Sequence, residues 1–159
     1  MFSSFQRVAH EITIFHYPSS PASQRALNML RSAVSGPFPA GKASSPPLDF
    51  ELEVVEAPPT SDQLRTIMSY ISGPGQRASA ASVFLSAHPS TPYGSEAPQS
   101  MSAIHDIGAK NPHALKWPIV VDWAAGKASI GGDVEGILES LRKKRDGELS
   151  EEEPKGWFS

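Results

Sequence analysis

The pattern of hydrophobic and polar positions predicts that strands and helices alternate along the chain. Glu11 to Tyr17 (EITIFHY) is a run of β-branched and aromatic residues that ends at Pro18, as expected for a largely buried strand. In the segment that follows, Ser20 can cap a helix and Pro21 occupies its first turn. The apolar residues of this helix repeat at helical spacing: Ala26, Met29, Leu30 and Ala33.

A second strand and helix follow a stretch rich in Pro, Ser and Gly at 35–47, which we interpret as a surface linker. Apolar residues alternate with mostly acidic ones over Phe50 to Val55, the pattern of an edge strand. After Pro58 and Pro59, Thr60 and Gln63 form a capping box. The next residues predict an amphipathic helix, with apolar side chains at i, i+3, i+4 and i+7: Leu64, Ile67, Met68 and Ile71.

Periodicity weakens over 72–116, where turn residues interrupt short helices expected at about 78–85 and 102–107. Regularity returns with a strand from Pro118 to Trp123, a turn, and a strand from Lys127 to Ile130, which together predict an antiparallel hairpin. Asp133 is the expected cap of a last helix. Its apolar face is again spaced at i, i+3, i+4 and i+7: Val134, Ile137, Leu138 and Leu141.

The order β-α-β-α-β-β-α, with an irregular helical insert at 72–116, predicts an α/β fold of the thioredoxin-like type. A right-handed crossover makes the first two strands parallel, and the hairpin completes a four-stranded mixed sheet with helices on both faces. In that fold a proline, usually with a cis peptide bond, precedes the third strand, as in Trp117-Pro118. The alternative is a trans proline at the start of an edge strand.

Composition limits the organisation and the chemistry. The 159 residues, of which 39% are hydrophobic, are enough for one domain, which we place at 11–145. The chain has no cysteine, which excludes disulfides, thiolate metal sites and cysteine nucleophiles. The net charge of −3 argues against nucleic acid as a partner, and no apolar run is long enough for a transmembrane segment. The five histidines lack the spacing of a metal site, so no metal is predicted.

The two ends of the chain differ from the domain between them. Residues 1–10 contain Arg7 and two serines but no acidic residue, the composition of a short mitochondrial presequence. Residues 146–159 carry the acidic run Glu151 to Glu153 and are expected to form a disordered acidic tail.

Three segments together resemble a family of fungal mitochondrial redox proteins with a thioredoxin-like domain: ITIFHYPSSPASQRALNML (12–30), DFELEVVEAPPTSDQLRTIMSYI (49–71) and WPIVVDWAAGKASIGGDVEGILESL (117–141). The resemblance implies a mitochondrial location and a thiol-linked reduction of small toxic molecules. It also implies a reactive cysteine in a segment that corresponds to about Ile104 to Gly108. This chain has no cysteine there, so no catalytic residue carries over.

The loop before the first helix is the first candidate site, because a helix amino terminus stabilises an anion and lowers the pKa of a thiol. Ser19, Ser20 and Ser23 occupy this region. Their hydroxyl groups and the N–H groups of the helix start are candidates for binding glutathione or another anion. The alternative is that these serines only cap the helix.

The second candidate site is the main chain at Trp117 and Pro118, which can present an edge to glutathione or to an extended peptide. Trp123 is either part of the same wall or a core residue. Asp122 is either a buried proton shuttle or part of the hairpin turn, and we favour the turn.

Two functions are consistent with these features. One is a mitochondrial oxidoreductase-type protein, which would need bound glutathione because a thiol mechanism requires a thiolate. The other is a non-catalytic thioredoxin-fold module that binds or scaffolds a protein partner.

Overall fold

The computed structural model describes residues 10–38, 45–71, 79–86 and 100–147. Nearly all of the predicted presequence and of the predicted acidic tail lies outside these residues. So does the middle of the predicted linker, at 39–44. No helix in the described part of the chain is long and apolar enough to cross a membrane.

Four strands form one mixed sheet in the order β2-β1-β3-β4. The first two, β1 (His10–Phe15) and β2 (Phe50–Val55), run parallel. The third, β3 (Ile119–Asp122), is antiparallel to both β1 and β4 (Lys127–Ile130). The sequence predicted this sheet, including the edge position of β2 and the β3–β4 hairpin.

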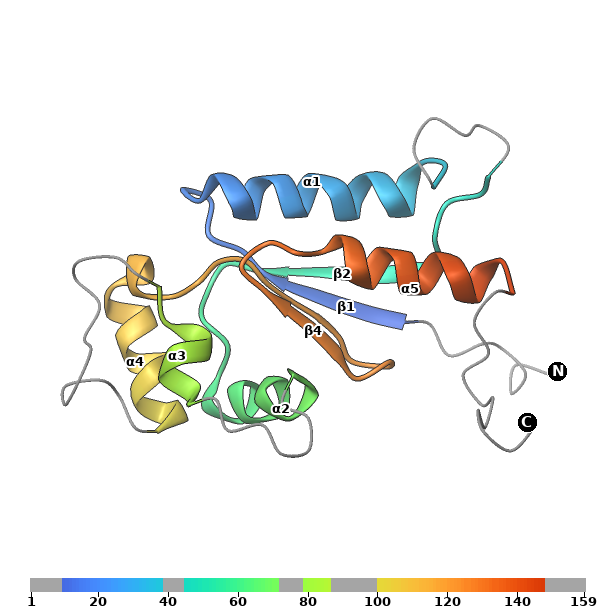
Figure 1. Cartoon of the computed structure of the whole chain (residues 1–159). Helices are drawn as coiled ribbons and strands as arrows, with labels where there is room; N and C mark the ends of the chain where they lie inside the picture. The colour runs from blue at the N-terminus through green and yellow to red at the C-terminus, as the bar shows by residue number, and fades with distance from the viewer. Residues whose placement is uncertain (1–9, 39–44, 72–78, 87–99, 148–159) are drawn as a thin grey trace, which may run out of the picture.

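Helices cover both faces of the sheet (Figure 1). One face carries α1 (Pro21–Ser35) and α5 (Glu135–Arg145). The other face carries α2 (Ser61–Ile71) and the elements of the predicted insert. This insert is more regular than its turn residues suggested. Its described residues include α3 (Ala80–Phe84), α4 (Met101–Lys110) and the 3₁₀ helix η3 (Pro112–Ala114).

Strand alternation divides the core into two layers. Ile12 and Ile14 of β1 are fully buried against α1 and α5, whereas Phe15 packs with the cluster on the α2 side. Burying a side chain of this size stabilises the fold by about 1.5–3 kcal/mol. From Ile12 to Phe15, neither face of β1 is exposed to solvent, because helices cover both faces of the sheet.

Two of the three predicted helix caps are present. Ser20 is the N-cap of α1 and accepts a hydrogen bond from the N–H of Ser23 at 3.2 Å. Thr60 and Gln63 form the reciprocal capping box at the start of α2, with distances of 2.9 and 3.2 Å.

The predicted cap at Asp133 is wrong. The helix α5 begins at Glu135, with Val134 at the N-cap position and no side-chain cap hydrogen bond. Val134 is fully buried, and its N–H donates to the Gly132 carbonyl at 2.9 Å. Val134 belongs to the apolar face predicted for α5, and this face is buried as expected.

Candidate functional site

The fold brings the amino end of α1 close to the start of β3. The peptide bond between Trp117 and Pro118 is cis. A Cβ atom placed on Gly132 would lie 3.8 Å from the Cβ of Ala22 and 4.0 Å from the Cδ of Pro118, so Gly132 lies between them. Gly131 and Gly132 have φ values of 93° and 114°, which favour glycine, and the N–H of Gly131 donates to the Pro118 carbonyl at 2.9 Å. The two candidate sites of the sequence therefore lie next to each other in the fold.

Most hydrogen-bonding groups at the start of α1 are already paired. The side chain and the carbonyl of Ser20 accept the N–H groups of Ser23 and Gln24. Pro21 has no N–H group. Among the described residues, none accepts a hydrogen bond from the N–H of Ala22 or from the Ser20 hydroxyl. These two donors and exposed Ser19 remain available to a ligand.

Ser23 cannot contact a ligand directly, which corrects the prediction for this residue. Its side chain is fully buried, and its oxygen lies 2.6 Å from Nδ1 of His16. The same oxygen accepts the N–H of Tyr17 at 3.0 Å. Ser23 therefore ties the first turn of α1 to the end of β1 and positions the loop that carries Ser19 and Ser20.

His16 is a site residue that the sequence analysis did not identify. It is only 6% exposed and lies beneath the first turn of α1. Strand alternation in the sequence could have identified His16 as buried, because Ile12, Ile14 and His16 share one face of an extended chain. A histidine on that face must meet a polar group of the covering helix, since buried polar groups are hydrogen-bonded.

Trp117 and Pro118 form the opposite wall of the site. Both are buried; the Trp117 indole donates to the Pro112 carbonyl at 2.7 Å, and its ring centroid lies 5.5 Å from that of Tyr17. Tyr17 also meets exposed His113 edge-on at 5.6 Å. Among the described residues, none forms a hydrogen bond with the main-chain N–H or C=O of Trp117. The main-chain groups of Trp117, a residue that is only 8% exposed, therefore have no hydrogen-bond partner in the described part of the chain and lie near the start of α1.

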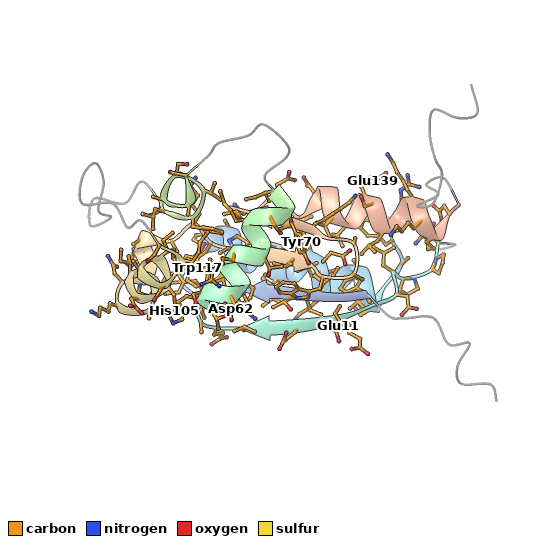
Figure 2. The ribbon with its side chains drawn as sticks, turned by 90° about the horizontal axis from the view of Figure 1, so that it is seen from below. Glu11, Asp62, Tyr70, His105, Trp117 and Glu139 are labelled. Atoms are coloured by element: carbon orange, nitrogen blue, oxygen red, sulfur yellow. The ribbon has the colours of Figure 1, made fainter. Side chains whose placement is uncertain are left out.

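Trp123 and Asp122 are not part of this site. Trp123 donates to Oγ1 of Thr13 at 2.8 Å and packs against Tyr70, at the opposite end of β3 from Trp117. In Figure 2, Trp117 lies toward the Asp62 end of α2, whereas Tyr70 lies toward the other end. Asp122 is 1% exposed and accepts the N–H of Ala125 at 3.1 Å. Asp122 is part of the turn, as the favoured interpretation expected, and it is also buried, which that interpretation did not expect.

The segment Ile104 to Gly108 belongs to α4 and has a structural role. Ile104 is fully buried, and Nδ1 of His105 lies 2.8 Å from the Pro59 carbonyl. Gly108 packs directly on Leu115. Within the described residues, no three side chains of the metal-ligating types gather into a site.

Comparison with protein families gives one match. Residues 2–133 match a family described as "Protein of unknown function (DUF1687)". The chain belongs to the DUF1687 family. The match spans the sheet and every described helix except α5, so it includes the whole candidate site. No curated protein sequence matches the chain.

Solved structures similar to this DUF1687 protein include an arsenate reductase from Vibrio cholerae, with a TM-score of 0.51 and 18% identity. The match covers 83% of this chain and 98% of the reductase. A candidate arsenate reductase from Yersinia pestis matches with a TM-score of 0.48 and 23% identity, over 80% of this chain and 98% of the other. The first of these likenesses shows that the fold is thioredoxin-like.

Proposed function

We propose that this protein is a redox protein of the oxidoreductase type that uses bound glutathione in place of a cysteine of its own. The observation that carries the proposal is that the start of α1 lies near the main chain of Trp117, which has no hydrogen-bond partner among the described residues. A tripeptide thiol has both features that this site accepts: a peptide main chain for strand-like pairing, and a thiolate for a helix start.

The described residues have distinct roles toward such a ligand. The main-chain groups of Trp117 pair with the peptide part of glutathione, and buried Pro118 forms the wall beneath it. The Ser20 hydroxyl and the Ala22 N–H donate hydrogen bonds to the thiolate, and Ser19 lies exposed at the rim. Hydrogen bonds to an ionised acceptor are the stronger kind, at roughly 1.5–3 kcal/mol each.

Bound glutathione supplies the thiol that this chain lacks. Two glutathione molecules give two electrons and two protons to an oxidised substrate, and leave joined as the disulfide. The substrate class is a small toxic molecule, as the resemblance to the fungal mitochondrial redox proteins implies. Arsenate belongs to this class, and the structural similarity to arsenate reductases makes it the first substrate to test. A mitochondrial location is part of the same proposal.

Calorimetric titration of reduced glutathione into the full chain tests this binding. Ser20→Gly removes the hydroxyl but costs only a few tenths of a kcal/mol as a cap substitution. We expect it to weaken glutathione binding by about tenfold, which corresponds to one hydrogen bond of about 1.4 kcal/mol.

The matched control is Ser100→Gly, which makes the same change at the N-cap of α4. It should leave glutathione affinity unchanged. Equal binding by Ser20→Gly and the wild type, or no heat from the wild type at millimolar glutathione, would refute the proposed site.

The second candidate is a non-catalytic binding or scaffolding module. It is favoured by the hydrogen bonds that Ser20 and Ser23 form within the protein, because most of their hydrogen-bonding groups are then not available to a ligand. Glutathione-dependent reduction of arsenate, followed as formation of glutathione disulfide, separates the two functions. Binding without turnover would support the module, and turnover lost in Ser20→Gly would support the enzyme.

A further inference from the structure

The two edges of the sheet are protected differently. Along the open edge of β2, Glu51 and Glu53 are exposed, and charged side chains discourage pairing with another strand. Along β4 (KASI) the only charge is at Lys127, and the strand has no proline. Lys127 lies at one end of the strand and bonds to Ser140 of α5 at 2.6 Å. The β4 edge is therefore the one open to pairing.

The register of the hairpin identifies the main-chain groups on that edge. The N–H of Gly131, just after β4, donates across the hairpin to Pro118, just before β3. The alternation that follows makes Ser129 and Lys127 the residues of β4 that bond to β3. The N–H and C=O groups of Ala128 and Ile130 then point outward. Among the described residues, none pairs with them.

A hollow of about 460 Å³ runs along this edge. Tyr70 and Ile71 at the end of α2 form one wall, and Asp133 and Gly136 at the start of α5 form the other. Figure 1 shows β4 between these two helices. The hollow gives an additional strand room beside β4.

Ser129 lies at the centre of the edge and lacks a partner. Its hydroxyl is buried, and among the described residues it is the one buried side-chain polar atom without a hydrogen bond. Leaving such a group unpaired costs about 1–3 kcal/mol, so a partner that supplies the missing hydrogen bond is favoured.

We propose that β4 pairs with β4 of a second copy of this chain, antiparallel and about a two-fold axis through Ser129. In this register Ala128 faces the partner's Ile130, and all four outward groups on each strand form hydrogen bonds. Ser129 faces the partner's Ser129 in a non-hydrogen-bonded pair, where side chains approach most closely; a rotation of the buried hydroxyl toward the partner lets the two hydroxyl groups bond to each other.

Charge also favours a second copy as the occupant. Antiparallel pairing places the Lys127 end of one strand beside the Gly131 end of the other, and the partner's Asp133 follows two residues later. Opposite charges therefore meet at both ends of the paired strands. Two short strands bury less surface area than the about 1,200–2,000 Å² of a stable interface. We therefore expect a weak, reversible dimer.

Sedimentation equilibrium of the full chain across micromolar to near-millimolar concentration tests this dimer. The wild type should double its mass reversibly with concentration. Ala128→Pro removes an outward N–H that β3 does not use, and should abolish dimerisation. Gly136→Glu places a carboxylate in the hollow of both copies, where space is open, and should also abolish it.

The matched control is Gly136→Ala, which adds a methyl group into open space and should leave the dimer intact. Thermal melts of dilute samples verify that each variant still folds. If Ala128→Pro does not fold, Gly136→Glu still tests the dimer. A wild type that stays monomeric throughout, or a dimer that survives in a folded Gly136→Glu variant, would overturn the proposal.

Discussion

At the residue scale, neighbouring serines in one turn of α1 have different roles. Ser20 faces the open site and keeps a donor hydrogen for a ligand, whereas Ser23 is buried with His16 and Tyr17. The difference follows from position, because the third residue of the helix turns back toward the end of β1. A binding role and a structural role are therefore separable by mutation.

Ser23→Ala should destabilise the fold by about 1–3 kcal/mol, because it leaves the Tyr17 N–H and Nδ1 of His16 without a partner. Denaturant unfolding followed by circular dichroism measures the change. Ser102→Ala, at an exposed position of α4, is the control and should change stability little. A Ser23→Ala midpoint equal to the wild type would contradict the buried pairing.

The sequence indicated this candidate site but not the arrangement of the buried residues beneath it. Ser20 was predictable as a cap, because serine before proline at a first turn is a local signal. Burial of Ser23 was not predictable from the helix alone, since it depends on His16, seven residues earlier in a different element.

At the element scale, two helical glycines differ in the space around them. A Cβ on Gly108 of α4 would lie 2.4 Å from Cδ1 and 2.8 Å from Cγ of buried Leu115. A Cβ on Gly136 of α5 would meet nothing within 4 Å. The same substitution should therefore have opposite effects in the two helices.

Gly136→Ala should stabilise the protein by about 0.5–1 kcal/mol, the helix preference of alanine over glycine. Gly108→Ala gains the same preference but overpacks the core, which costs about 1–3 kcal/mol, so it should be net destabilising. Unfolding free energies of the two variants provide the comparison. Stabilisation of equal size in both would show that α4 does not pack closely on Leu115.

The end of α5 should respond to acid. Arg142 bonds to Glu139 at 2.7 Å and lowers the pKa of that carboxyl below its ordinary 4.5. Bonds from Arg145 and then Arg142 lower the pKa of Asp146 below 3.8. A lowered pKa means that the unfolded chain binds the proton more tightly, so this contribution is present above the ordinary values and is lost as pH falls below them.

Thermal melts from neutral pH to below 3.8 at low salt should therefore show a smaller acid-induced loss in Glu139→Gln than in the wild type. The effect is modest because the pairs are exposed, and high salt should reduce it through screening. Parallel curves for the two proteins at low salt would contradict this role of Glu139.

The boundaries of most elements were predictable where the signal was local. Apolar spacing and capping residues located α1 and α2, and alternation with a proline break located β2 and β3. The start of α5 was predicted incorrectly, because Val134 occupies the N-cap position and Asp133 forms no side-chain cap hydrogen bond. The helices of the insert were only partly predictable, since they are short and depend on contacts with α2.

At the scale of the whole molecule, the protein has a thioredoxin-like fold, but its candidate site has no cysteine thiol. The order of elements predicted the fold, because a parallel crossover followed by a hairpin leaves few arrangements of four strands. Absence of cysteine is a property of this sequence, not of the fold. The start of α1 and the main chain of Trp117 lie close together, so we propose that a thiol brought by a ligand supplies the chemistry.

The most direct test of this account is an amide NMR titration of the full chain with reduced glutathione. The account predicts saturable shifts that cluster at Ser19, Ser20, Ala22 and Trp117, while the amides of β4 and of the far end of α2 stay unchanged. No shifts at millimolar glutathione, or shifts scattered away from the start of α1 and Trp117, would contradict it.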